Sequence, residues 1–104
     1  MELAFETLDL RTVCESEAKA RRKFGPCIAN ALKRRIADLR AAPSVKDLPV
    51  GKPNQGSGTY VFDLDEGLVL RIIPNHIENP KFPTGDVNWA KVTHIKISAI
   101  EGNQ

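Results

Sequence analysis

Residues 26–42 carry the clearest periodic pattern in the chain. Their large apolar side chains recur at intervals of four, four and three residues: Ile28, Leu32, Ile36 and Leu39. This spacing lines one face of an α-helix. Pro26 suits the first turn, where its missing N–H costs no hydrogen bond, and Pro43 disfavours helical backbone in the residue before it. The pattern predicts an amphipathic helix over residues 26–42.

A second helix is predicted immediately before it, over residues 7–25. Apolar residues again fall near helical spacing, Thr7 or Asp9 provides a side-chain cap at the start, and Gly25 suits the position after the last turn. The two predicted helices meet at the sequence FGP, residues 24–26. We therefore expect a helical hairpin whose apolar stripes face a common layer.

Alternation of apolar and polar residues predicts four strands, over residues 2–6, 59–64, 68–73 and 92–100. The three-residue connection DEG predicts a hairpin closed by a type I turn and a G1 bulge. That register pairs Val61 with Arg71 and Asp63 with Val69. One face then carries Tyr60, Phe62, Leu64, Leu68, Leu70 and Ile72. Arg71 falls on the other face, with Asp63 as its diagonal ion-pair partner.

The remaining segments are predicted as loops. Residues 43–58 and 74–91 hold three prolines each, and a loop as long as the second is commonly functional or disordered. Phe82 and Trp89 indicate that this second loop docks on the core. In the last strand, Ile95, Ile97 and Ala99 are expected on one face and His94, Lys96 and Ser98 on the other; residues 101–104 are expected to form a polar tail.

The predicted order is β-α-α-β-β-β, an α+β fold with one antiparallel sheet and a helical hairpin on one face. The chain has 104 residues, the size of a single domain spanning residues 1–104. It contains no apolar run near the roughly 20 residues of a membrane helix and no signal-peptide pattern, so we expect a cytoplasmic protein. Cys14 and Cys27 lack metal spacing and are expected as small, partly buried side chains in a reducing compartment.

Charge is unevenly distributed. Residues 19–40 hold eight cationic side chains and one acid, Asp38, for a net charge of 8 − 1 = +7. Such asymmetry is typical of proteins that bind a polyanion or an acidic protein. The alternative is an ordinary solvated helix surface.

The candidate chemistry lies on the sheet face away from the helices. Arg71, His94 and Lys96, with Lys46 and Lys52 from the preceding loop, form a candidate phosphate site. In RNA cleavage through the 2′-hydroxyl, His76 or His94 would transfer protons and Arg71 would stabilise the developing charge. The alternatives are a structural ion pair for Arg71 and plain surface roles for both histidines. His76 and His94 lie 18 residues apart with no further ligand at metal spacing, so we expect no metal and no other cofactor.

Two segments resemble a known family. The segment LKRRIADLRAAPSVKDLPVG, residues 32–51, and Leu70-Arg71-Ile72, together with the predicted element order, resemble toxins of the RelE/ParE superfamily, most closely the HigB-like plasmid maintenance killer branch. The resemblance implies a curved antiparallel sheet on a helical hairpin, and a growth-inhibiting toxin neutralised by a cognate antitoxin, commonly a small helix-turn-helix protein. For the RelE and HigB branches it implies ribosome-dependent mRNA cleavage, with Arg71 on the scissile phosphate.

The end of the chain departs from that family. HigB-like chains tend to end in an acidic–Tyr–His cluster, whereas residues 100–104 read IEGNQ. Three hypotheses follow. The chain is an mRNA endoribonuclease in which His76 or His94 transfers protons; or it is a ParE-like, gyrase-directed toxin that needs no such groups; or it is a catalytically weakened relative that binds a protein through its basic helices.

Overall fold

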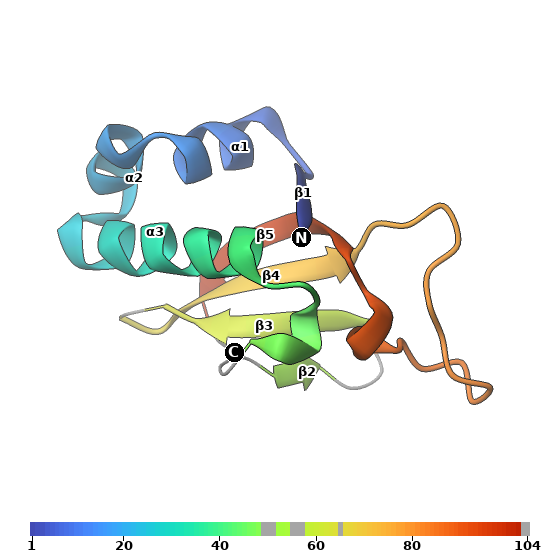
Figure 1. Ribbon diagram of the computed structural model, residues 1–104. Coiled ribbons are helices and arrows are strands. Elements are labelled where there is room, and N and C mark those ends of the chain that lie inside the picture. Colours follow the sequence, from blue (N-terminus) through green and yellow to red (C-terminus); the bar gives the residue numbers. More distant parts are fainter. Residues whose placement is uncertain (49–51, 55–57, 65, 103–104) are drawn as a thin grey trace.

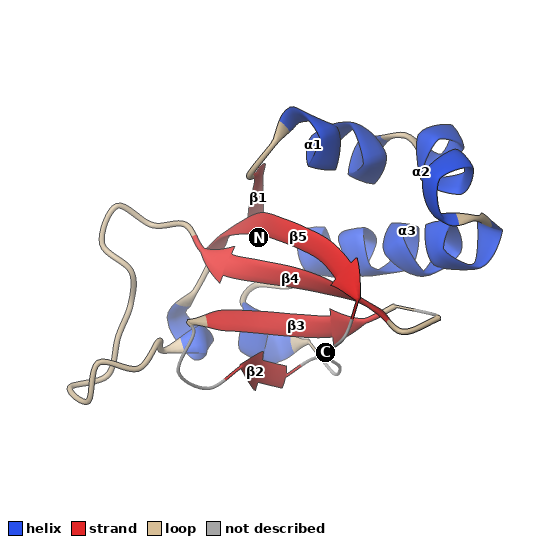
Figure 2. Ribbon diagram, turned by 180° about the vertical axis from the view of Figure 1, so that it is seen from behind, coloured by secondary structure: helices blue, strands red, loops and turns tan. Residues whose placement is uncertain are grey.

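The computed structural model describes residues 1–48, 52–54, 58–64 and 66–102. Five strands make one sheet, in the spatial order β1 (Glu2–Phe5), β5 (His94–Gly102), β4 (Leu68–Pro74), β3 (Thr59–Asp63) and β2 (Lys52–Asn54). The helices are α1 (Leu8–Glu15), α2 (Glu17–Phe24) and α3 (Pro26–Ala41), with short 3₁₀ turns η1 (Val45–Asp47) and η2 (Trp89–Lys91). Helices cover one face of the sheet (Figure 1), and the other face is bare when seen from behind (Figure 2).

The predicted α+β class, with a helical layer on one face of the sheet, is confirmed. Two details of the sheet differ from the prediction. Strand β1 runs parallel to β5, so the sheet is mixed rather than wholly antiparallel. Strand β2 forms within the segment predicted as loop 43–58, where it pairs with β3 at the sheet edge. Its sequence, Lys-Pro-Asn, has no apolar alternation, so the pattern of apolar and polar residues did not indicate a strand here.

The helix predicted over residues 7–25 is wrong in one respect, because it is broken at Ser16. This residue has extended backbone (φ −121°, ψ 108°) and serves both helices. Its N–H donates to the carbonyl oxygen of Thr12, which closes α1, and its hydroxyl accepts from the N–H of Lys19, which caps α2. Ser competes for backbone hydrogen bonds and therefore favours helix ends over helix interiors. At the other end of α1, Thr7 is the cap, as predicted.

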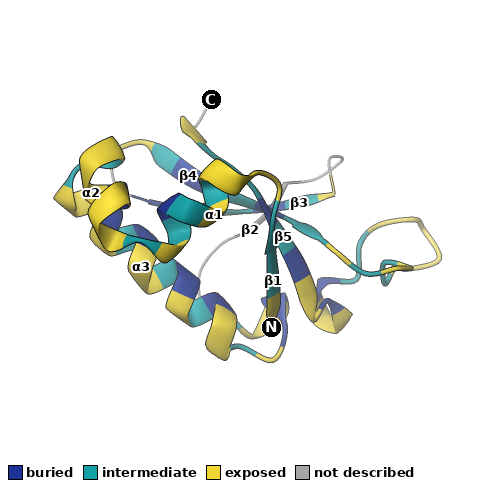
Figure 3. Ribbon diagram, turned by 90° about the horizontal axis from the view of Figure 1, so that it is seen from above, coloured by how far each residue is buried: buried dark blue, intermediate teal, exposed yellow. Residues whose placement is uncertain are grey.

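The core lies between α3 and the sheet. The predicted stripe of α3 is buried, with Ile28, Leu32 and Leu39 at most 1% exposed. Opposite it, the sheet contributes a matching set of buried residues: Phe62, Leu70, Ile72, Ile95 and Ile97. Helices α1 and α2 present mostly exposed residues (Figure 3), and Val13 and Ala20 are their buried members. Burial of each large aliphatic side chain contributes roughly 1.5–3 kcal/mol, so α3 and the central strands carry most of the stability.

Strand β5 contains a bulge that the alternation pattern did not predict. Arg71 pairs with Ala99 but its neighbour Ile72 pairs with Ile97, so Ser98 is an extra residue. Its hydroxyl donates to the carbonyl oxygen of Arg71 at 3.2 Å. A bulge shifts the alternation by one residue. Consequently Ala99 lies on the bare face, contrary to the prediction, and Ile100 packs against the core instead.

The hairpin between β3 and β4 has the predicted register, with Val61 opposite Arg71 and Asp63 opposite Val69. Gly67 takes φ +77°, which favours glycine. The predicted turn type also involves Asp65, which lies outside the described residues. The predicted polar tail is wrong for residues 101 and 102, because β5 continues to Gly102 and pairs with the start of β4; residues 103 and 104 lie outside the described residues.

The long connection after β4 docks through part of its length. Trp89 is buried, as expected, with its ring edge-on to Tyr60 at 5.1 Å between centroids. Phe82 is 50% exposed and therefore does not anchor the loop, contrary to the prediction. Within the described residues, none of the helices combines the length and apolar character needed to cross a membrane.

Replacing the buried Ile72 with alanine should lower the free energy of unfolding by about 2–5 kcal/mol, because the change removes methylene groups and leaves a cavity in the central strand. The matched control is Leu8→Ala, which removes an apolar side chain that is 76% exposed. We expect this control to stay within about 0.5 kcal/mol of the parent. Urea unfolding followed by circular dichroism measures both, and equal losses would contradict the core described here.

The two cysteines should differ in reactivity. Burial raises the pKa of the Cys14 thiol from 9.0 to about 11, with a further rise from Glu15 and a lowering from Arg40, whereas Cys27 is exposed, contrary to the expectation of partial burial. The thiolate is the reactive form. At pH 8, iodoacetamide should therefore modify Cys14 at least about tenfold more slowly than Cys27, as measured by mass spectrometry, with Cys27→Ser as the control that isolates Cys14. Equal rates would contradict this.

Candidate functional site

Arg71 lies in the middle of β4, on the bare face of the sheet. Its Nε donates to Oε1 of Glu101 on β5 at 2.8 Å, and the two side chains are 25% and 50% exposed. The ion pair predicted with Asp63 is therefore wrong. Asp63 and Glu101 both align with Val69, one from each neighbouring strand, so both lie diagonal to Arg71. The glutamate side chain is longer by one methylene and extends across the diagonal, whereas Asp63 remains exposed.

The ion pair leaves part of the guanidinium unused. Within the described residues, neither Nη atom of Arg71 has a hydrogen-bond partner. Arginine presents these N–H groups as a planar fork that matches the two oxygens of a phosphate or a carboxylate. Val69, which shares this face, is only 2% exposed although no helix covers it. Arg71 therefore lies beside a buried apolar side chain, and its two Nη groups have no hydrogen-bond partner among the described residues.

Lys96 is a second cation on this face, farther along β5. Its Nζ lies 3.1 Å from Oε2 of Glu6, which follows β1, and its side chain is 31% exposed. The parallel pairing of β1 with β5 creates this contact, because it places Ala4 opposite Lys96 and leaves Glu6 two residues farther on. The charge of Lys96 is thus partly compensated, which weakens its use as a phosphate ligand.

The two histidines meet where the long loop joins β5. Their rings stack edge to face with 5.0 Å between centroids. Nε2 of His76 accepts hydrogen bonds from the backbone N–H groups of Thr93 and His94, at 3.2 and 3.3 Å. Nδ1 of His94 lies 3.0 Å from Oγ1 of Thr93. One nitrogen of His76 is therefore committed to the backbone, while Nε2 of His94 has no hydrogen-bond partner among the described residues.

The structure does not gather Arg71 and the histidines into one site. His76 follows Arg71 by five residues, and Ala99, opposite Arg71, follows His94 by five. Among the described residues, no hydrogen bond or ion pair joins Arg71 to either histidine. Proton transfer to or from a group at the scissile phosphate requires hydrogen-bond distance, directly or through one water. The predicted catalytic set Arg71, His76 and His94 therefore divides into two separate clusters.

The two loop lysines of the predicted phosphate site lie in different settings. Lys46 is exposed on η1, which lies on the helix-covered side of the sheet (Figures 1 and 2). It therefore lies across the sheet from Arg71. Lys52 begins β2, and its backbone pairs with Val61, the neighbour of Arg71. Its side chain lies outside the described residues.

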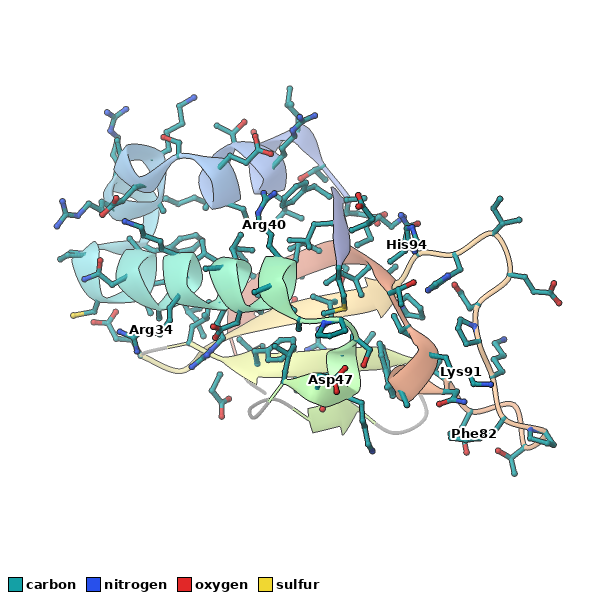
Figure 4. All side chains as sticks on the ribbon, in the orientation of Figure 1. Arg34, Arg40, Asp47, Phe82, Lys91 and His94 are labelled. Carbon is teal, nitrogen blue, oxygen red and sulfur yellow. The ribbon has the colours of Figure 1, made fainter. Side chains whose placement is uncertain are left out.

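The helical side offers a separate charged groove. A cavity of about 390 Å³ lies between α1 and α2, lined by Asp9, Thr12, Val13, Lys19, Arg22 and Lys23. Of the eight cations in residues 19–40, two form ion pairs with described residues: Lys33 with Glu17, and Arg35 with Asp38. The other six have no such partner among the described residues. Most of the cations in the predicted basic surface are therefore not neutralised by ion pairs with described residues. Figure 4 shows one of them, Arg34, on α3.

Two carboxylates of the bare face were missed by sequence reasoning. Glu101 lay in the segment expected to be a tail, although the apolar residue before it, Ile100, indicated that the strand continues. Glu6 was seen as part of a strand, but its contact with Lys96 depends on the parallel pairing of strands that are distant in sequence. In the described part of the chain, no group of three or more His, Cys, Asp or Glu side chains is placed to hold a metal ion.

Comparisons with known proteins are sparse. No protein-family model matches the sequence, and no curated protein matches it. Among solved structures, the chain is similar to one described as the chromosomal ParDE TA system from P. aeruginosa, with 13% sequence identity, a TM-score of 0.49, and coverage of 100% of this chain and 97% of that chain. At this identity and score the likeness assigns no family and no activity.

A double-mutant cycle on Arg71 should identify its partner. Arg71→Ala combined with Glu101→Ala should give a coupling free energy of about 0.5 kcal/mol, because the pair is partly exposed. The matched cycle of Arg71→Ala with Asp63→Ala should give a coupling near zero. Urea unfolding of the five variants and the parent at low salt measures both cycles. A larger coupling for Asp63 would contradict the observed pairing.

Proposed function

We propose that this chain is the toxin of a cytoplasmic type II toxin–antitoxin pair. The observation that carries the proposal is the position of Arg71. The segments at residues 32–51 and 70–72 resemble RelE/ParE-superfamily toxins, and the observed fold agrees with the fold this resemblance implies, a helical layer on one face of a small sheet. In that setting Arg71 lies on the bare face of a central strand with an open guanidinium fork. A guanidinium fork placed there matches the two oxygens of a carboxylate or a phosphate on a macromolecular target.

The proposed mode of action is binding rather than RNA cleavage. Two observations support it: among the described residues no hydrogen bond joins Arg71 to either histidine, and Nε2 of His76 is engaged by two backbone N–H groups. Of the activities that the resemblance implies, this favours the ParE-like, gyrase-directed one, which needs no proton-transfer residues. The fork of Arg71 would then bind a carboxylate or phosphate of the target.

Ribosome-dependent mRNA cleavage is the competing activity, and one observation favours it. Glu101 lies 2.8 Å from Arg71, so a carboxylate able to accept a proton lies beside a cation able to stabilise a phosphorane. In this version Glu101, rather than His76 or His94, would act as the base. The leaving 5′-oxygen would still need an acid, but the Ser98 hydroxyl is bonded to the Arg71 carbonyl and the Lys96 ammonium is paired with Glu6.

The proposed partner is a cognate antitoxin, a small helix-turn-helix protein on the expectation from the resemblance. The groove between α1 and α2 supports a contact with an acidic segment of such a partner. Lys19, Arg22 and Lys23 line one side of it without ion-pair partners among the described residues. A weakened relative that acts only as a basic protein-binding module would use this same groove and would not depend on Arg71.

Arg71→Ala should abolish growth inhibition when the chain is expressed in bacteria without its antitoxin, because the open fork is lost while the position outside the hydrophobic core leaves the fold intact. Asp63→Ala, on the same face but without contact to Arg71, should remain as toxic as the parent. Colony counts after induction measure toxicity, and circular dichroism confirms folding. Toxicity unchanged by Arg71→Ala but lost in a Lys19/Arg22/Lys23 charge-reversal variant would instead support the basic module.

The same induction distinguishes the two activities. Intact mRNA with accumulated DNA breaks is expected for the proposed gyrase-directed mode. Cleaved mRNA with intact DNA would overturn that mode, and loss of the cleavage in Glu101→Gln would then assign the base. Growth without any inhibition by the parent chain, in the absence of an antitoxin, would contradict the toxin proposal itself.

A further inference from the structure

The loop between β4 and β5 is closed at its base by one side chain. His76 stands two residues after the end of β4, and its Nε2 accepts the N–H groups of Thr93 and His94, 17 and 18 residues later. Asn79 Oδ1 accepts the N–H of His76 at 2.9 Å, which holds the chain in a turn at that point. Figure 4 shows His94 at this junction and Phe82 far out on the loop. His76 thus joins both ends of the projecting segment.

The bonding pattern defines the chemical state of the ring. A neutral imidazole has one N–H and one acceptor nitrogen, and a protonated imidazole has no acceptor. Because Nε2 accepts, the proton must be on Nδ1. Protonation at Nε2 would place its new N–H against two backbone donors and remove both hydrogen bonds together.

We propose that His76 is a pH-sensitive latch, which holds the loop on the sheet while its imidazole is neutral and releases the segment 76–88 when the ring is protonated. The latch goes beyond the proposed function and does not depend on it. The release is local, because the chain on both sides of this segment has its own anchors. Trp89 and Val92 are buried in the core, and the N–H of Asn75 donates to the carbonyl oxygen of His94 at 2.8 Å.

The charged groups around the latch are few and come from three elements. On β5, the His94 ring faces His76 and would oppose a second positive charge. On β1, Glu2 lies opposite His94 in the strand register. On the loop, Glu78 follows His76 by two residues, and both glutamates are exposed. Exposed carboxylates favour the protonated ring weakly, because solvent screens them. The deciding contribution is therefore the loss of the acceptor.

The segment that the latch holds has an ordered shape and an apolar surface. Lys81 and Val87 form a bridge, and the N–H of Phe82 donates to the carbonyl oxygen of Asp86 at 2.8 Å. Ile77 and Phe82 are exposed large apolar residues on this segment. Release of the base would change the position of this apolar surface relative to the sheet.

Two NMR measurements on the complete chain test the latch. Long-range ¹H–¹⁵N spectra of the imidazole should show His76 as the Nδ1–H tautomer when neutral. Amide exchange, corrected for intrinsic rates, should show that protection at Thr93 and His94 falls about tenfold when the pH is low enough for the imidazole spectra to show a protonated His76, because two modest hydrogen bonds are lost.

Three variants complete the test. His76→Ala should show the low protection at every pH, and His76→Gln, whose carbonyl accepts but does not titrate, should keep the protection in acid. His94→Gln, the matched control, should retain the pH response. The proposal is overturned by an Nε2–H tautomer, by protection in the parent that does not change with pH, or by a response that is lost in His94→Gln and kept in His76→Gln.

Discussion

The bulge at Ser98 is the constraint on which the bare face of this protein depends. Strand β5 begins with Ile95 and Ile97 in the core, and without an extra residue its alternation would continue to Ala99. The bulge reverses the alternation for the last part of the strand. Ile100 then packs against the core and Glu101 lies on the face of Arg71. One residue, bonded through its hydroxyl to the Arg71 carbonyl, therefore decides which carboxylate Arg71 meets.

This arrangement orients the Arg71 side chain and leaves part of its guanidinium group available for binding. The ion pair with Glu101 uses Nε and leaves the fork open. Because Glu101 is half exposed, water screens the pair and it adds little stability. Its effect is to hold a long side chain in one geometry, which reduces the entropy lost when a target binds. The same ion pair is compatible with a binding role and, through the Glu101 carboxylate, with a minimal nuclease.

The histidines take a role that their chemistry alone does not suggest. His76 and His94 were candidates for proton transfer because imidazole titrates near neutrality. In the fold they lie at the base of a loop, and His76 serves the backbone of Thr93 and His94 as an acceptor. Histidine is suited to catalysis because its ring readily gains and loses a proton. In the proposed latch, the same property makes the hydrogen bonds of His76 depend on pH.

The sequence by itself determined the elements that follow from periodicity. The stripe of α3, the hairpin register that pairs Val61 with Arg71, and the bare-face position of Arg71 all depend on spacing within short segments. Tertiary structure alone decided the rest. The parallel pairing of β1 with β5, the bulge at Ser98 and the separation of Arg71 from the histidines depend on contacts between distant segments. Local periodicity carries no record of such contacts, because backbone pairing between distant strands leaves little mark on either sequence.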